Sequence, residues 1–216
     1  MSSRDEILKR VRAGVGKDEF ARRKAVAEAY MAAHKRGPQP VVSNEMANRF
    51  RAKAEYLSST IEQIESIIDA PSAVARYLAS LELGSKAVAT PDVAGLAWAS
   101  AGLDVHEGVA VDADKVGISG CFCAIAETGT LLLLSGPASP ASVSLLPETH
   151  IALVQESRIV ATMEDAFALL RSERGGLPRA ANFISGPSRT GDIEQTIVLG
   201  AHGPCRVHLI MVKKDV

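Results

Sequence analysis

The sequence is short of aromatic residues and of net charge, and each shortage excludes a class of protein. Aromatic residues make up 4% of the 216 residues, too few for the base-stacking surfaces of proteins that bind single-stranded nucleic acid. The formal net charge is -1, from 24 Lys+Arg and 25 Asp+Glu, so no excess charge favours nucleic acid or an acidic membrane. We therefore expect no nucleic-acid partner.

Cysteines and long apolar runs are scarce too. Three cysteines at positions 121, 123 and 205 do not make a disulfide framework, and Cys121 and Cys123 would face opposite sides of a strand. We therefore expect no metal site, no iron–sulfur cluster and no cofactor in this chain. The run around Leu131–Leu134 is far short of the about 18 residues that a membrane span needs. Because the first residues are charged, with no apolar leader, we expect a cytoplasmic protein without a membrane span.

What the sequence does contain is an uneven distribution of charge. Residues 1–68 hold 13 Lys+Arg and 9 Asp+Glu, whereas residues 69–216 hold 11 and 16. The first part has helical spacing of its apolar residues in the segments that begin near Ser3, at Asp18 and at Asn44, the last running to Ile68. We predict that residues 1–68 form a helical arm packed on a main domain at residues 69–216. The alternative is an arm that binds a partner.

The main domain has the pattern of an α/β fold. Short apolar segments, typical of strands buried on both faces, alternate with helix signals such as Pro71 in a first turn and Gly84 at a helix end. This alternation predicts a mostly parallel sheet flanked by helices. The expected strands are at residues 86–90, 103–105, 116–120, 121–126, 131–134, 150–154, 183–185 and 207–212.

A first candidate site is the segment Ala126-Glu127-Thr128-Gly129-Thr130. It lies between two apolar runs, so Glu127 is predicted at a strand end or sharp turn, where Gly129 would permit a positive φ. A carboxylate at such a place can act as a base or nucleophile. It can equally accept backbone N–H bonds and only fix the turn.

A second candidate follows a predicted strand, over Ser185 to Glu194. Gly186 and Pro187 force a turn, and Ser188 and Thr190 are residue types that cap helices. Amide groups at a helix N-terminus, these hydroxyls and Arg189 would suit a carboxylate or a phosphate. The alternative is a capped helix in which Arg189 pairs with Asp192.

A third candidate is His202, between two glycines in Gly200-Ala201-His202-Gly203-Pro204. An imidazole there could be a general acid or base, or could donate to an anion. It could also simply hydrogen-bond a carbonyl group in a turn.

Taken in order, four motifs resemble one family, the lactate utilization protein C family of LUD-domain proteins. The motifs are Ala126–Thr130, Leu146-Pro147-Glu148-Thr149-His150-Ile151, Gly186–Glu194 and Gly200–Pro204. The likeness covers about residues 70–215. The sequence departs from the family pattern at Phe122, where an acidic residue is common, and at Gly191, where alanine is common.

The resemblance implies a fold like that of sugar-phosphate isomerases and CoA transferases, and a part in the oxidation of L-lactate to pyruvate. It implies iron–sulfur and cysteine-rich protein partners, which would carry the redox centres, so this chain is expected to be a non-redox subunit. Glu127 and His202 are the expected catalytic residues. The residues expected to bind a small carboxylate or phosphate are Thr128, Gly129, Thr130, Gly186, Ser188, Arg189 and Thr190. The alternative is an independent acyl/CoA-transferase-like or phosphosugar-handling enzyme that uses Glu127.

Overall fold

The computed structural model describes residues 3–15, 20–39, 45–193 and 196–214. The chain divides into two compact units, residues 1–40 and residues 41–216. The first unit contains α1 (Ser3–Val15) and α2 (Phe20–Ala32), which begin close to the predicted starts. Every described side chain of both helices is exposed.

The second unit is built on a six-stranded sheet in which every pairing is parallel. The strand order is β1-β12-β7-β4-β2-β3. The strands are β1 (Thr60–Ser66), β2 (Lys86–Ala89), β3 (Asp104–Glu107), β4 (Val116–Gly120), β7 (Thr149–Gln155) and β12 (Arg206–Lys214). The central strands β4 and β7 are almost wholly buried, as expected for a parallel sheet covered on both faces.

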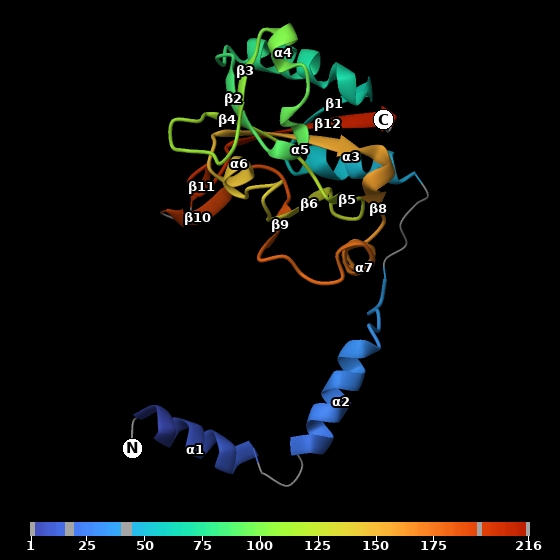
Figure 1. Ribbon diagram of the computed structural model, residues 1–216, viewed down its shortest axis with the longest axis vertical. Helices are drawn as coiled ribbons and strands as arrows, with labels where there is room; N and C mark the ends of the chain where they lie inside the picture. Colours follow the sequence, from blue (N-terminus) through green and yellow to red (C-terminus); the bar gives the residue numbers. More distant parts are fainter. Residues whose placement is uncertain (1–2, 16–19, 40–44, 194–195, 215–216) are drawn as a thin grey trace. The chain divides into compact units, whose positions relative to one another are not determined.

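Different layers cover the two faces of this sheet. On one face, α4 (Ala70–Ser80) contributes Ala73, Val74 and Leu78 to a cluster with Ile118 and Ile151 of the sheet. On the other face lie α3 (Met46–Tyr56) and a smaller sheet. Figure 1 shows α4 on the opposite side of β1 and β12 from this smaller sheet.

The smaller sheet has four strands in the order β8-β5-β6-β9. These are β5 (Cys123–Ile125), β6 (Thr130–Leu134), β8 (Ile159–Val160) and β9 (Ala181–Ile184). A hairpin of β10 (Arg189–Ile193) and β11 (Thr196–Leu199) stands apart from both sheets. The remaining elements are η1 (Ile67–Asp69), α5 (Pro91–Ala94), η2 (Trp98–Ala101), α6 (Ser142–Leu145), η3 (Glu156–Arg158) and α7 (Met163–Arg174).

The predicted fold class, a mostly parallel sheet flanked by helices, is confirmed. The helix expected over residues 44–68 is wrong in its second half, because α3 ends at Tyr56 and β1 follows. Ser58, with φ +70°, breaks the helix, and residues 60–66 pair along the edge of β12. The predicted boundary after residue 68 therefore falls within the second unit. That the arm packs on the main domain stays a prediction.

A second correction concerns the segment that follows Ser188. The helix expected there is wrong, because Arg189–Ile193 is β10 and pairs with β11 in an antiparallel hairpin. β-Branched residues such as Thr190, Thr196 and Ile197 favour this extended form. No helix N-terminus is therefore present beside Ser188, and the amide groups that were expected to hold an anion are engaged in a hairpin.

Candidate functional site

A cavity of about 680 Å³ lies at the carboxyl ends of three strands of the large sheet. Asp92 follows β2, Cys121 and Phe122 follow β4, and Gln155 ends β7. Strand β2 pairs with β3 on one side and with β4 on the other, so the chain changes direction across the sheet at this point. In open parallel sheets, ligands bind at the carboxyl ends beside such a switch point.

The carboxylate of Asp92 is held at the end of β4. Thr90 Oγ1 donates a hydrogen bond to Asp92 Oδ1, and a side chain at Gly120 would overlap Asp92 Oδ2. Asp92 is exposed, and among the described residues its Oδ2 has no hydrogen-bond donor. The missing side chain at Gly120 therefore leaves room for a carboxylate that faces the cavity with a free acceptor.

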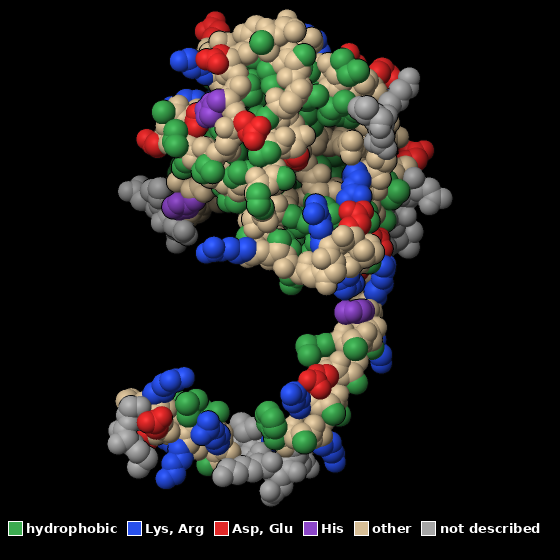
Figure 2. Space-filling view, in the orientation of Figure 1, with side chains coloured by type: hydrophobic (Ala, Val, Ile, Leu, Met, Phe, Trp, Pro, Cys, Tyr) green, Lys and Arg blue, Asp and Glu red, His purple; other side chains and the backbone are tan. Residues whose placement is uncertain are grey.

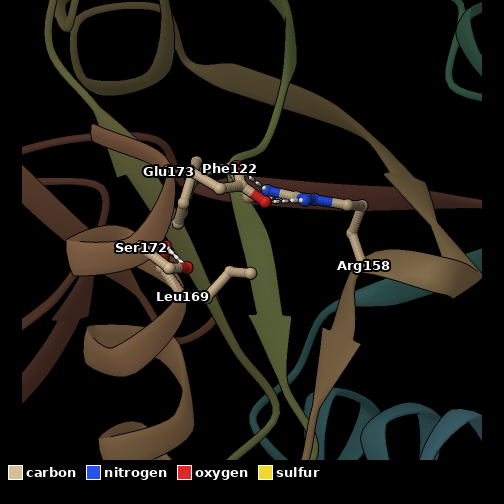
Figure 3. Close-up of polar contacts among 5 residues, drawn as sticks. All are labelled: Phe122, Arg158, Leu169, Ser172 and Glu173. Atoms are coloured by element: carbon tan, nitrogen blue, oxygen red, sulfur yellow. Dashed lines mark hydrogen bonds and ion pairs between the residues drawn. The ribbon is translucent and has the colours of Figure 1, made fainter. Parts of the chain in front are cut away.

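Arg158 is part of another wall of the cavity, and Figure 3 shows its contacts with Glu173 and Phe122. Its Nη1 and Nη2 donate to the two carboxylate oxygens of Glu173 on α7, at 2.6 and 3.0 Å, and its Nε donates to the carbonyl of Phe122 at 3.0 Å. The guanidinium carbon lies 4.9 Å from the centre of the Phe122 ring. The hydrogen bonds from Arg158 hold the pKa of Glu173 below its usual range. Both charges are thus largely compensated within the wall.

The cavity also has ionic and polar groups that are not engaged. Arg174, the last residue of α7, lines the cavity and makes no hydrogen bond or ion pair in the described part of the chain. The side-chain amide of Gln155 also lines the cavity and makes no hydrogen bond in the described part of the chain. The apolar part of the lining includes Leu134, Pro137, Leu177 and Pro178. The cavity therefore offers an acceptor at Asp92, an amide at Gln155, a cation at Arg174 and an apolar surface.

Cys121, which follows β4, and Cys123, which begins β5, are poor nucleophiles. Burial raises the pKa of Cys121 to about 12 and that of Cys123 to about 11. The thiolate is the form that attacks substrates and binds metals. At neutral pH both groups are thiols and contribute mainly to packing.

The site residues predicted from the sequence lie at the amino end of the large sheet, opposite the cavity. In the turn after β5, Gly129 has φ +68°, and a side chain there would overlap the backbone of Lys53 and Ala54 in α3. Thr128 Oγ1 donates to Thr130 Oγ1 at 2.8 Å, and Thr130 Oγ1 is 2.7 Å from Ser185 Oγ. The hydroxyls of this turn therefore bind one another and join it to the end of β9.

The segment from Gly186 to Arg189 meets the same part of the chain. Gly186 has φ +80°, and a side chain there would overlap the carbonyl of Leu57. Arg189 Nη2 donates to that carbonyl and to Ser58 Oγ, at 3.1 and 2.6 Å. The structure thus brings the motif around Gly129 and the motif around Gly186 together on the residues that precede β1.

Ser188 connects these loops to the third motif. Its amide donates to the carbonyl of Pro204, and its own carbonyl accepts from the amide of Gly200. A side chain at Gly203 would contact Ser188 Cβ at 3.3 Å. His202, in the same loop, is exposed. Within the described part of the chain its ring has no hydrogen-bond partner.

The predicted residues therefore form a connected set of loops, but none of them lines the 680 Å³ cavity. Thr190 is buried in β10, and Glu127 is half-buried, with a carboxylate that has no partner among the described residues. The predicted roles of these residues stay predictions. Sequence reasoning missed Asp92 and Arg158; the turn that Pro91-Asp92 makes directly after β2 was the one available signal.

The charges of the second unit form no large surface of one sign on the face that Figure 2 draws, where acidic and basic side chains are interspersed. No group of three or more His, Cys, Asp or Glu side chains within the described ranges could hold a metal ion. Helices in those same ranges are all too short or too polar to cross a bilayer.

The second unit is similar to a known protein family. The profile of a family described as LUD domain matches residues 44–212. "Lactate utilization protein C" of Bacillus subtilis is 35% identical over 166 residues, which are 70% of this chain and 66% of that protein. The protein of that name from an Exiguobacterium species is 38% identical over 118 residues, 53% of this chain and 51% of that protein. The chain thus spans between half and two thirds of the length of these relatives.

A solved structure is also similar to this chain. The crystal structure of a duf162 family protein from Deinococcus radiodurans has a TM-score of 0.60 and 27% sequence identity, over 80% of this chain and 99% of that chain. The resemblance predicted from the four motifs is therefore confirmed at the level of the family.

Proposed function

The chain belongs to the LUD domain family, and from this premise we propose that it serves in the bacterial use of L-lactate as a component without a redox centre of its own. The likeness to "Lactate utilization protein C" of Bacillus subtilis, over 166 residues, is the observation that carries the proposal.

The proposed partners are iron–sulfur and cysteine-rich proteins that carry the electrons. Residues 1–40 hold ten Lys+Arg and five Asp+Glu, and Arg10 and Arg22 are exposed on α1 and α2. A basic surface accelerates association with an acidic one. Reversing the charge of Arg10 and Arg22 to Glu should reduce co-purification of such partners with the whole chain. The control is Lys86→Glu, an exposed position on β2. Equal capture of partners by the unaltered chain, by the Arg10 and Arg22 variant and by Lys86→Glu would contradict this docking.

The proposed ligand is a small carboxylate or phosphate held in the cavity beside Arg174. Calorimetric titration of the whole chain with L-lactate and with pyruvate tests this. Arg174→Ala should weaken binding about tenfold, the effect of losing a hydrogen bond to a charged group. Arg189→Ala tests the rival location, the loops that hold Glu127, Ser188 and His202. If Arg189→Ala alone weakens binding, the ligand lies in those loops and the cavity is excluded.

A second function, an independent acyl/CoA-transferase-like or phosphosugar-handling enzyme, is favoured by one observation. The Glu127 carboxylate is half-buried in a sharp turn and has no partner among the described residues, so it is free to contact a substrate. Turnover by the purified chain that is lost in Glu127→Gln and kept in Glu107→Gln, an exposed position of β3, would support it. Without turnover by the chain alone, this alternative fails.

A further inference from the structure

The volume of the cavity is the first indication of what it binds. Lactate occupies on the order of 100 Å³, on a scale where a water molecule takes about 30 Å³. A cavity of about 680 Å³ is several times larger and falls in the range typical of cofactor-sized ligands. Lactate alone would leave most of the wall without contacts.

The positions of the unengaged groups give the chemistry. Asp92 offers a carboxylate oxygen at the end of β2, and a ligand hydroxyl is the natural donor to it. In parallel sheets, an acidic side chain near a strand end often binds the hydroxyls of a ribose. Arg174 is the cation that lines the cavity without an ion-pair partner among the described residues, so an anionic group belongs near it. The pairing of Arg158 with Glu173 reduces the repulsion that Glu173 would exert on that anion.

The remaining wall offers an apolar surface to a ligand. Leu134 and Pro178 line the cavity, and Leu177 at its rim is 74% exposed. An apolar group of a ligand would remove this surface from water, at about 25 cal/mol per Å². The free amide of Gln155 can donate and accept hydrogen bonds at the edge of a base.

From this arrangement we propose that the cavity is a nucleotide site, with the ribose hydroxyls on Asp92, the phosphate toward Arg174 and the base against Leu134, Leu177 and Pro178. The inference rests on the proposed function only in taking the cavity as the ligand site. It deepens that function, because the anion near Arg174 is then the phosphate end of a larger molecule. The proposal concerns binding alone, so no covalent bond is made or broken.

The test is calorimetric titration of the whole chain with adenosine 5′-monophosphate and, separately, with adenosine. Asp92→Asn keeps the size of the side chain and removes its charge, and should weaken binding of both probes about tenfold. Arg174→Ala should weaken binding of the monophosphate about tenfold and leave adenosine unchanged. Asp104→Asn, at an exposed position that begins β3, and Arg171→Ala, one turn earlier on α7, should bind as the unaltered chain does.

Two results would overturn the proposal. One is no measurable binding of the monophosphate at millimolar concentration. The other is binding that Asp92→Asn and Arg174→Ala leave unchanged. L-lactate is titrated against the same samples: if lactate binds and the monophosphate does not, the nucleotide site is refuted and the role in lactate use stands. If the monophosphate binds as expected and lactate does not, the nucleotide site stands and the lactate ligand is refuted.

Discussion

The two ends of the parallel sheet are built differently. At the amino end, Gly129, Gly186 and Gly200 have positive φ values and lie so close to neighbouring chain that a side chain would overlap it. At the carboxyl end, Gly120 leaves its space to the carboxylate of Asp92, and a cavity opens. The glycine-rich motifs that stand out in the sequence therefore serve close packing at one end. The groups suited to a ligand lie at the other.

The largest expected effect that separates the two ends is the response to acid. His150 and His208 lie near the starts of β7 and β12, and burial lowers the pKa of each to about 4. An unfolded histidine has a pKa near 6.5, so the unfolded chain binds more protons between pH 6.5 and 4. Stability is complete above pH 6.5 and falls as the pH drops through this range, by roughly 3 kcal/mol for each histidine.

Urea unfolding at pH 7 and at pH 4.5 measures this loss. His150→Gln and His208→Gln should each reduce the difference between the two pH values. His106→Gln, on exposed β3, provides the comparison, because it removes an imidazole and its contact with Asp114 but no buried ring. A pH response that survives both buried substitutions would assign the acid sensitivity to other groups.

The next effect concerns the packing of the amino end. Gly129→Ala should lower the free energy of unfolding by about 2–4 kcal/mol, because a strained φ and a backbone overlap act together. Gly175→Ala is the matched control: its φ is +67°, and no atom lies within 4 Å of the added carbon, so about 1 kcal/mol is expected. Equal losses in urea unfolding would mean that the loop around Gly129 moves away at no cost.

A smaller effect is expected at the carboxyl end. Arg158→Lys keeps the charge but loses the paired hydrogen bonds to Glu173 and the bond to the Phe122 carbonyl. Because Glu173 is more than a third exposed, the loss should be only about 1 kcal/mol. The exposed pair of Lys213 and Glu65 gives the lower limit: Lys213→Met should leave the free energy of unfolding almost unchanged. A loss at Arg158 as small as this would show that the clamp does not stiffen the cavity wall.

Some of the site could be anticipated from the sequence and some could not. The turn at Gly129 with a positive φ was predicted, because glycine between two apolar runs permits that conformation. The cavity was not predicted, because Asp92, Gln155 and Arg174 are far apart in the chain and occur in no recognisable motif. The helix after Ser188 was predicted from residues that cap helices, yet the same residues are compatible with the hairpin that forms.

By itself, the sequence determined the alternation of strands and helices and the family, because apolar periodicity and ordered motifs are local properties. Tertiary structure decided whether residues 60–66 become a strand, since the open edge of β12 supplied partners that a helix would not have used. It also decided the place of the cavity. Strand order sets which carboxyl ends meet, and strand order follows from the packing of the whole chain.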